Sequence, residues 1–277
     1  MQKVPFKTMP SQISDLSPEA LLQAARDISA AALDKPLRHF RSGFSIEQKA
    51  DESPVTVADR ETEAALRAAI AARFPDHGIL GEEHGHEAGR SGLTWVLDPI
   101  DGTRSFISGV PLWGTLIALN DGERPVIGVM DQPYIGERFV GRPGGSELIG
   151  PMGTIPLKTS ACTKLEEALI GNTDPAMFHL DDEKAAFREI SSKARLRRFG
   201  GDCYFYCLLA AGTLDLVIES GLQPYDIQAL IPVIENAGGI VTSWSGGDAQ
   251  EGGQVVAAAN YELHEAALKI LGQAAND

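Results

Sequence analysis

Two carboxylates three residues apart stand at the end of a short apolar run. Asp98 and Asp101 follow the hydrophobic residues 95–97. Carboxylates at this spacing are typical of sites for hard divalent cations such as Mg²⁺, which is often shared with a substrate phosphate. Gly102 and Thr103 come next, and their backbone N–H groups could approach a phosphate oxygen at the start of a helix. The sequence therefore predicts a metal site and a phosphate site that touch each other.

Three other acidic positions could join this pair. Glu82 follows a short predicted strand, Asp226 is expected at a helix start, and Asp59 lies in the first turn of another predicted helix. A negative side chain at a helix start is stabilised by roughly 0.3–1 kcal/mol, so Asp59 and Asp226 are also typical helix-end residues. Glu82 and its neighbour Glu83 are equally typical of solvated charges. The Asp98–Asp101 pair itself is compatible with an Asx-type turn.

Alternating helices and strands would position these residues. Ser17 and Pro18 are the residue types expected at a helix N-cap and first turn, and an apolar stripe continues to about Leu33. From about Thr159 the pattern changes to βαβ-like units. The glycine-rich segments 84–92 and 142–151 are expected to be a loop and turns. Strands are predicted at 78–81, 95–97, 112–120, 125–132, 138–141, 168–172, 214–219, 240–244 and 255–259, and helices at 57–74, 182–193, 202–211 (capped by Asp202), 226–237 (capped by Asp226) and 262–271.

The composition is that of an acidic globular protein. In 277 residues, 38 Asp and Glu against 24 Lys and Arg give a net charge of −14, which argues against nonspecific binding to nucleic acid or anionic membranes. We expect neither partner. Three cysteines make no disulfide framework, residues 1–16 lack a signal-peptide core, and no apolar run is long enough to cross a bilayer. We therefore expect a cytoplasmic protein.

Taken together, the motifs resemble the inositol monophosphatase superfamily of lithium-sensitive, Mg²⁺-dependent phosphomonoesterases. The resemblance covers about residues 49–242 and rests on GEE at 81–83, DPIDGTRSF at 98–106, and YD at 225–226 leading to AGG at 237–239. One departure is Tyr225, where the family commonly has Trp. The resemblance implies an α/β (α+β layered) fold with alternating α-β-α-β-α layers of the inositol monophosphatase / fructose-bisphosphatase type, and a homodimer. Residues 1–150 would form an α+β domain with most metal and phosphate ligands, and residues 151–277 an α/β domain with Asp226 and the specificity residues.

Within the superfamily, the wording of three segments is most similar to the histidinol-phosphate phosphatases. These segments are 98–119, FGGDCY at 199–204 and LQPYDIQAL at 222–230. The resemblance implies hydrolysis of L-histidinol phosphate to L-histidinol and phosphate in histidine biosynthesis. Two alternatives stay open: an inositol-1-phosphatase or broader sugar or nucleotide phosphomonoesterase of the same superfamily, and, more remotely, a non-catalytic scaffold. The complete set of acidic positions and Thr103 argues against the scaffold.

The resemblance also implies a ligand set for the metal. Glu82, Asp98 and the Ile100 carbonyl would hold one Mg²⁺, and Asp98, Asp101 and Asp226 would hold a second. A third ion near Glu82 is expected in some members, so two or three Mg²⁺ are expected per active site.

The catalytic and phosphate-binding roles follow in the same way. Asp59, Thr103 and Glu82 are the implied catalytic residues, with the Thr103 hydroxyl paired to Asp59 so that together they orient the attacking water and accept its proton. The N–H groups of Gly102 and Thr103 would bind phosphate oxygens. Lys49 is expected either near the phosphate or in solvent.

Substrate choice should depend on charge. Histidinol phosphate carries a protonated amine and an imidazole that is partly protonated near neutral pH, and cations favour carboxylate partners. Asp202 and Glu219 lie in the half of the chain expected to face the leaving group, although Asp202 is also typical of a helix N-cap. Arg104 is expected either to bind this small-molecule phosphate ester or to be an ordinary surface charge.

Overall fold

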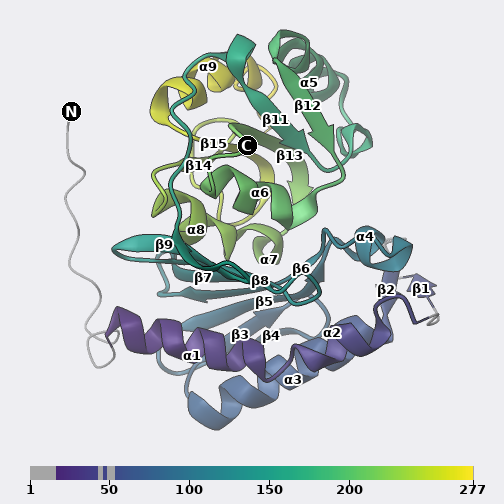
Figure 1. The fold of residues 1–277 in the computed structure, drawn as a ribbon, viewed down its shortest axis with the longest axis vertical. Coiled ribbons are helices and arrows are strands. Elements are labelled where there is room, and N and C mark those ends of the chain that lie inside the picture. The colour runs from purple at the N-terminus through teal and green to yellow at the C-terminus, as the bar shows by residue number, and fades with distance from the viewer. Residues whose placement is uncertain (1–16, 43–45, 49–53, 277) are drawn as a thin grey trace.

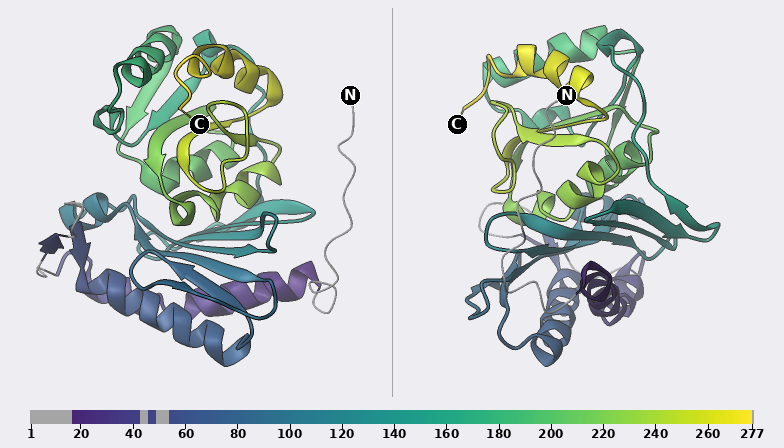
Figure 2. Two further views of the ribbon diagram at one scale, coloured as in Figure 1. Left: turned by 180° about the vertical axis from the view of Figure 1, so that it is seen from behind. Right: turned by 90° about the vertical axis from the view of Figure 1, so that its left-hand side faces the viewer.

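The chain folds into five stacked layers of helices and sheets. The computed structural model describes residues 17–42, 46–48 and 54–276, so Lys49 lies outside the described residues. From one end to the other, the layers are helices α1–α3, an eight-stranded sheet, helices α6–α8, a five-stranded sheet, and helices α5 and α9 (Figures 1 and 2). This is the predicted α-β-α-β-α layering.

The observed elements follow the predicted order closely. The helices are α1 Pro18–Ala30, α2 Asp34–His39, α3 Val57–Arg73, α4 Thr103–Ser108, α5 Asp181–Lys193, α6 Asp202–Ala210, α7 Pro224–Ile227, α8 Leu230–Glu235 and α9 Tyr261–Leu271, with 3-10 turns at Leu165–Glu167 and Pro175–Met177. The strands are β1 Ile46–Gln48, β2 Pro54–Thr56, β3 Gly78–Gly81, β4 Gly85–Glu87, β5 Thr94–Asp101, β6 Gly114–Asn120, β7 Pro125–Gln132, β8 Glu137–Arg142, β9 Gly145–Gly150, β10 Gly153–Pro156, β11 Leu169–Asn172, β12 Leu196–Phe199, β13 Leu216–Leu222, β14 Ile240–Ser243 and β15 Gly253–Ala258.

Two mixed sheets form the frame. The larger has the order β10-β9-β8-β7-β6-β5-β3-β4, and it is antiparallel except where β3 pairs in parallel with β5. The smaller has the order β12-β11-β13-β15-β14, in which β11 is parallel to both β12 and β13. A separate antiparallel pair joins β1 and β2.

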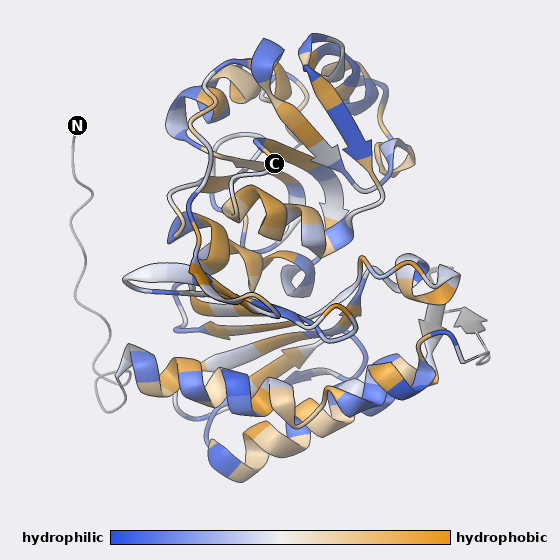
Figure 3. Ribbon diagram, viewed as in Figure 1, coloured by the Kyte–Doolittle hydropathy of each residue, from blue (hydrophilic) through white to orange (hydrophobic). Residues whose placement is uncertain are grey.

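Three hydrophobic cores lie between the layers. Because successive side chains of a strand point to opposite faces, each sheet that is covered on both sides feeds two cores. Along β6, Leu116 packs between the two sheets, and its neighbour Ile117 packs toward α1 and α3. Along β15, Val255 packs into the same central core, and Val256 packs toward α5 and α9. In Figure 3 the central strands and helices α6 and α8 are mostly hydrophobic, the edge strand β12 is hydrophilic, and α1 and α3 alternate between hydrophobic and hydrophilic stripes.

Helix α8 lies unusually close to the larger sheet at two glycines. A Cβ atom added at Gly128 would lie 1.8 Å from the Ala229 carbonyl oxygen, and one at Gly141 would lie 2.3 Å from Pro232. Neither position can carry a side chain unless the helix moves. The two glycines therefore set the spacing between the sheet and the helix layer that follows Asp226.

Several predicted elements need correction. The first helix ends at Ala30 rather than near Leu33, and a separate helix, α2, follows it. The expected loop at 84–92 contains the short strand β4, and the expected turns at 142–151 contain β9. In both segments the glycines occupy turns of hairpins rather than breaking the strands: Gly85 and Gly144 have φ values of 69° and 101°.

Both predicted helix caps in the second half are also wrong. The N-cap of α6 is Gly201 and that of α7 is Gln223, so Asp202 and Asp226 lie inside the first turns of these helices. The Asp226 carboxylate still accepts a hydrogen bond from the Gln223 N–H at its own helix start, whereas the Asp202 carboxylate is bonded to Ser105.

The expected domain boundary at 150/151 falls in the turn between β9 and β10. Because β10 pairs with β9, the larger sheet extends to Pro156, and the smaller sheet begins at Leu169. We propose that the two domains meet between these residues. Of the helices in the described ranges, none combines the length and the apolarity that crossing a bilayer requires.

Candidate active site

The register of two parallel strands brings Glu82 beside Asp98. Gly81 of β3 is paired with Leu97 of β5, and the Glu82 N–H donates to the Leu97 carbonyl at 3.2 Å. Each of these strands therefore ends in an acidic residue at the same edge of the sheet. The predicted association of Glu82 with the 98–101 motif is consistent with this register.

A break in strand pairing opens the motif at 98–101. The register between β5 and β6 shifts between Asp98 and Asp101, and the Asp98 carboxylate accepts a hydrogen bond from the Ile100 N–H at 2.9 Å. An irregularity of this kind re-aims side chains at a sheet edge. It turns the carboxylates of Asp98 and Asp101 toward the second half of the chain.

Helix α7 brings a third carboxylate to the same place. Asp98, Asp101 and Asp226 each offer an oxygen atom, and these atoms lie within 4.8 Å of one another. The Gln223 N–H donates a hydrogen bond to the Asp226 carboxylate at 2.7 Å. Asp98 is buried, and the other two are partly exposed. Residues 125 positions apart thus form one acidic cluster.

The cluster is electrostatically strained. Burial, together with the negative charges of Glu82, Asp101 and Asp226, raises the pKa of Asp98 well above its ordinary value. Burial and the charges of Asp202 and Asp226 do the same for the pKa of Asp101. The pKa of Asp226 rises to about 7, mainly because of burial and in spite of its bond to Gln223. Like charges therefore face one another inside the protein.

These donors fit a magnesium ion. They are all carboxylate oxygens, which are the ligands that hard divalent cations prefer, and their mutual repulsion would be relieved by positive charge. Glu82 raises the pKa of both Asp98 and Asp226, so its charge is felt at the same point. The predicted Ile100 carbonyl lies directly behind the cluster, in the strand between Asp98 and Asp101.

The turn after the cluster has the backbone shape expected of an anion-binding loop. Gly102 has φ 80° and ψ 39°, a left-handed conformation that glycine adopts without steric penalty. The Thr103 hydroxyl donates to the Ile100 carbonyl oxygen at 3.1 Å. Gly102 and Thr103 therefore directly follow the acidic motif, and their binding of phosphate stays a prediction.

The predicted pair of Thr103 and Asp59 is not formed among the described residues. Asp59 instead accepts hydrogen bonds from the N–H and the hydroxyl of Thr56, at 2.8 Å and 2.5 Å, and closes a capping box at the start of α3. Burial raises the pKa of Asp59, and the negative charge of nearby Glu82 adds to this shift. One helical turn further, the buried Glu63 accepts hydrogen bonds from the N–H groups of Glu83 and His84, so it supports the loop that carries Glu82.

Two acids join the halves of the chain reciprocally. The carboxylate of Asp101, from the first half, accepts a hydrogen bond from the Cys203 N–H at 2.7 Å. The carboxylate of Asp202, from the second half, accepts one from the Ser105 hydroxyl at 2.8 Å. Asp202 has φ 44°, and a Cβ at Gly102 would lie 3.1 Å from its side chain. Asp202 therefore packs directly on the Gly102 turn.

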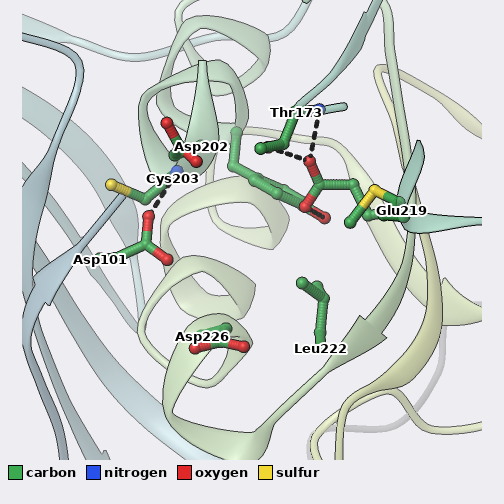
Figure 4. Close-up of a pocket in the computed structure, with 9 residues that line it drawn as sticks. Asp101, Thr173, Asp202, Cys203, Glu219, Leu222 and Asp226 are labelled. Atoms are coloured by element: carbon green, nitrogen blue, oxygen red, sulfur yellow. Dashed lines mark hydrogen bonds between the residues drawn. The ribbon is translucent and has the colours of Figure 1, made fainter. Parts of the chain in front are cut away.

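A pocket opens between this contact and Glu219 (Figure 4). Glu219 is 2% exposed, and its carboxylate accepts hydrogen bonds from the N–H and hydroxyl of Thr173 and from the Tyr206 hydroxyl. Burial raises its pKa to about 7 even though these bonds oppose the shift. The lining residues are Asp101, Thr173, Met177, Asp202, Cys203, Tyr206, Glu219, Leu222 and Asp226.

The pocket accounts for most of the predicted substrate residues. Asp202 and Glu219 both line it, whereas Arg104 is an exposed side chain. Burial raises the pKa of Asp202, and the Ser105 hydrogen bond and the positive charge of Arg104 only partly oppose this shift. Sequence reasoning missed Thr173 and Tyr206. Two signals pointed to them: Thr173 directly follows a predicted parallel strand, and Tyr206 lies one helical turn after Asp202.

Comparisons with known proteins agree with this geometry. The model of the inositol monophosphatase family matches residues 17–275. The bifunctional phosphatase IMPL2 of Arabidopsis thaliana is 40% identical over 95% of this chain and 78% of its own, and a histidinol-phosphatase of Chlorobaculum parvum is 32% identical over 92% and 98%. Among solved structures, an inositol monophosphatase from Zymomonas mobilis superimposes with a TM-score of 0.82 at 39% identity, covering 92% of this chain and 99% of its own.

Proposed function

Because the chain belongs to the inositol monophosphatase family, a family of phosphatases that use Mg²⁺, we propose that its substrate is L-histidinol phosphate. The products would be L-histidinol and inorganic phosphate, as in histidine biosynthesis. Histidinol-phosphatases from three bacteria are 31–34% identical to this chain and support the proposal.

The pocket composition is the observation that carries this choice. Next to the acidic cluster, it combines the carboxylates of Asp202 and Glu219 with the less polar side chains of Met177, Tyr206 and Leu222. A phosphate ester of inositol would present only hydroxyl groups there. Histidinol would present an ammonium group to the acids and a flat, partly charged ring to the apolar wall, and cations are attracted to both carboxylates and aromatic faces.

The acidic cluster would hold the metal. Asp98, Asp101 and Asp226, with Glu82 and the Ile100 carbonyl, are the proposed ligands of two or three Mg²⁺. When bound, Mg²⁺ would neutralise phosphate charge and increase the acidity of a nearby water molecule. Without it, the cluster would repel a phosphate group.

The remaining roles belong to the turn and to Asp59. The N–H groups of Gly102 and Thr103 would donate to phosphate oxygens. The Thr103 hydroxyl would orient the attacking water and, with Asp59, accept its proton. This role requires the Thr103 hydroxyl to leave the Ile100 carbonyl and Asp59 to exchange a Thr56 bond for it. Phosphoryl transfer needs little more from a protein than such positioning and charge stabilisation.

Hydrolysis of inositol phosphate is the second candidate. It is favoured by the 39% identity to the Zymomonas mobilis enzyme, whose name is inositol monophosphatase. A direct comparison of turnover on histidinol phosphate and inositol 1-phosphate would separate the two. Faster turnover of inositol 1-phosphate at equal concentration would overturn the histidinol assignment.

Asp202→Asn tests the proposed amine contact. Asparagine keeps an oxygen acceptor for Ser105 and nearly the same volume, but it removes the charge. We expect kcat/KM for histidinol phosphate to fall by roughly tenfold to a hundredfold, the range for a hydrogen bond to a charged group. Turnover of inositol 1-phosphate should change little.

Ser105→Ala is the matched control, because it removes the Ser105–Asp202 hydrogen bond, which Asp202→Asn retains, and keeps the Asp202 charge. If it reproduces the Asp202→Asn profile on both substrates, Asp202 acts by packing on the loop rather than by binding an amine.

Two further properties stay predictions: a homodimer, which the resemblance implies, and a cytoplasmic location, which the cysteine content favours. One relative is named as chloroplastic.

A further inference from the structure

Arg41 lies outside the pocket and is hydrogen-bonded to the C-terminal end of α4, the helix that follows the acidic cluster in sequence. Its guanidinium donates two hydrogen bonds to the Gly109 carbonyl oxygen, from Nε at 2.9 Å and from Nη2 at 2.7 Å. Gly109 is the C-cap of α4, with φ 75°. A cation at this end of a helix also meets the partial negative charge of its free carbonyl groups.

Two neighbouring aromatic rings, Phe40 and Tyr134, contact the guanidinium. Its central carbon lies 5.0 Å from the centre of the Phe40 ring and 4.8 Å from that of Tyr134, and Nη1 donates to the Tyr134 hydroxyl at 2.7 Å. A planar guanidinium stacked on rings keeps its donors in a fixed direction, which a lysine would not do. All the nitrogen atoms of the group are therefore engaged.

The same rings connect Arg41 to the metal motif. Phe40 contacts Phe106 of α4 and Trp113, with ring centres 5.4 Å apart in each case. These three rings form one buried cluster with Ala58 and Ile100, and Ile100 lies between Asp98 and Asp101. Side-chain contacts therefore connect Arg41, through Phe40 and the other two rings, to Ile100 of β5.

The backbone of Arg41 is strained. Its φ of 61° is a left-handed conformation that residues with a side chain seldom adopt. Such a conformation persists where surrounding contacts over-determine it, and it is found most often at sites under functional constraint. Here the strained backbone directs the side chain onto Gly109.

We propose that Arg41 is a positioning residue for the segment from Gly102 to Gly109. Near the start of this segment the Ser105 hydroxyl is bonded to Asp202, a contact that the proposed role of Thr103 leaves intact, and Arg41 is bonded to its end. With both ends held, the N–H groups of Gly102 and Thr103 keep one orientation. The proposal rests on the phosphate-binding role given to those two groups under the proposed function.

The variant Arg41→Gly is the sharpest test. Glycine accepts the left-handed backbone, so the side chain with its guanidinium is removed without forcing a change of backbone conformation. We expect inorganic phosphate to inhibit the Mg²⁺-loaded enzyme about three- to tenfold more weakly, since the lost bonds are charge-assisted but half in solvent. KM for the ester should rise by a similar factor, kcat should change less than twofold, and Mg²⁺ affinity should stay the same.

Hydrogen exchange gives a readout that needs neither metal nor turnover. In the metal-free protein, the amides of Phe106, Gly109 and Val110 are bonded within the α4 segment. Exchange at these amides should be about tenfold faster in Arg41→Gly than in the wild type. Arg41→Lys should fall between the two.

Arg90→Ala is the control, because Arg90 is also an exposed arginine with two bonds to one partner, Asp76, away from the site. If phosphate inhibition and exchange in Arg41→Gly match those of Arg90→Ala, the proposal is overturned. A wild-type protein that neither hydrolyses an ester nor binds phosphate would refute the proposed function instead. The exchange experiment would then still decide whether Arg41 holds α4.

Discussion

The protein buries two kinds of carboxylate, and they differ in their partners. Asp131, between α1 and β8, is bonded to the guanidinium of Arg138 and to the Ser29 hydroxyl. Glu183, at the start of α5, accepts four hydrogen bonds, and these hold its pKa below the usual value although burial alone would raise it. These are acids that stabilise the fold.

The acids of the pocket show the opposite pattern. The nearest charges to Asp98, Asp101 and Asp226 are negative, and their pKa values are raised. A bound cation would relieve this repulsion, which the fold relieves with partners at the other buried acids. Burial alone therefore does not mark a functional acid. The sign of the charges on neighbouring side chains distinguishes the two kinds of buried acid.

The largest expected effect comes from removing one charge of the cluster. Asp98→Asn should lower turnover by at least about a thousandfold, which corresponds to about 4 kcal/mol of activation free energy, and it should weaken Mg²⁺ binding. The melting temperature of the metal-free protein should stay equal or rise, because one repulsive charge is gone. Kinetics, calorimetric titration with Mg²⁺ and thermal melts would check this. Glu189→Gln, an exposed acid of α5, is the control; a large drop in metal-free stability for Asp98→Asn would contradict the comparison.

The paired acids should respond in the reverse way. Asp131→Ala leaves Arg138 with a partly buried, unpaired charge, and we expect the free energy of unfolding to fall by about 2–4 kcal/mol. The kcat of the folded enzyme should stay within about twofold of wild type. Urea unfolding and kinetics below the transition would measure both, with Asp131→Asn as the isosteric comparison. Loss of turnover at unchanged stability would contradict the assignment of Asp131 to the acids that stabilise the fold.

A smaller effect should appear in the pH dependence of the metal-free protein. Asp226 and Glu219 have pKa values of about 7 when folded but ordinary values, near 4, when unfolded. Between these values the folded state binds more protons than the unfolded state, so their contribution to stability falls as the pH rises from about 4 to above 7. We expect the metal-free protein in EDTA to lose stability between pH 5 and pH 8, and to recover it with Mg²⁺.

Comparing melts with and without Mg²⁺ isolates this effect. Burial lowers the pKa of His77 and His264, so these residues make the protein more stable as the pH rises, but they do so in either condition. If the gain from Mg²⁺ is the same at pH 5 and pH 8, the carboxylates do not share the proposed site.

Local patterns predicted most of this molecule. The helix at Val57–Arg73, the strand at Pro125–Gln132 and the acidic turn at 98–101 all depend on residues close in sequence, and their periodicity or spacing is visible there. The errors arose where distant contacts decide. Asp202 has the residue type of an N-cap, but its side chain is bonded to Ser105 and packs against Gly102, both from the other half of the chain. Its backbone has a left-handed conformation. Likewise, Thr103 bonds to Ile100 and Asp59 to Thr56, which spacing alone could not reveal.

The close seat of Asp202 on Gly102 has an evolutionary consequence. A mutation that changes what the pocket accepts at position 202 also alters the surface on which the turn at 102 and the hydroxyl at 105 rest. Selection for a new leaving group would therefore have to act on these three positions as a unit, and in an alignment of relatives they should covary. If positions 102 and 105 vary independently of position 202 among relatives, the three positions do not evolve as a unit.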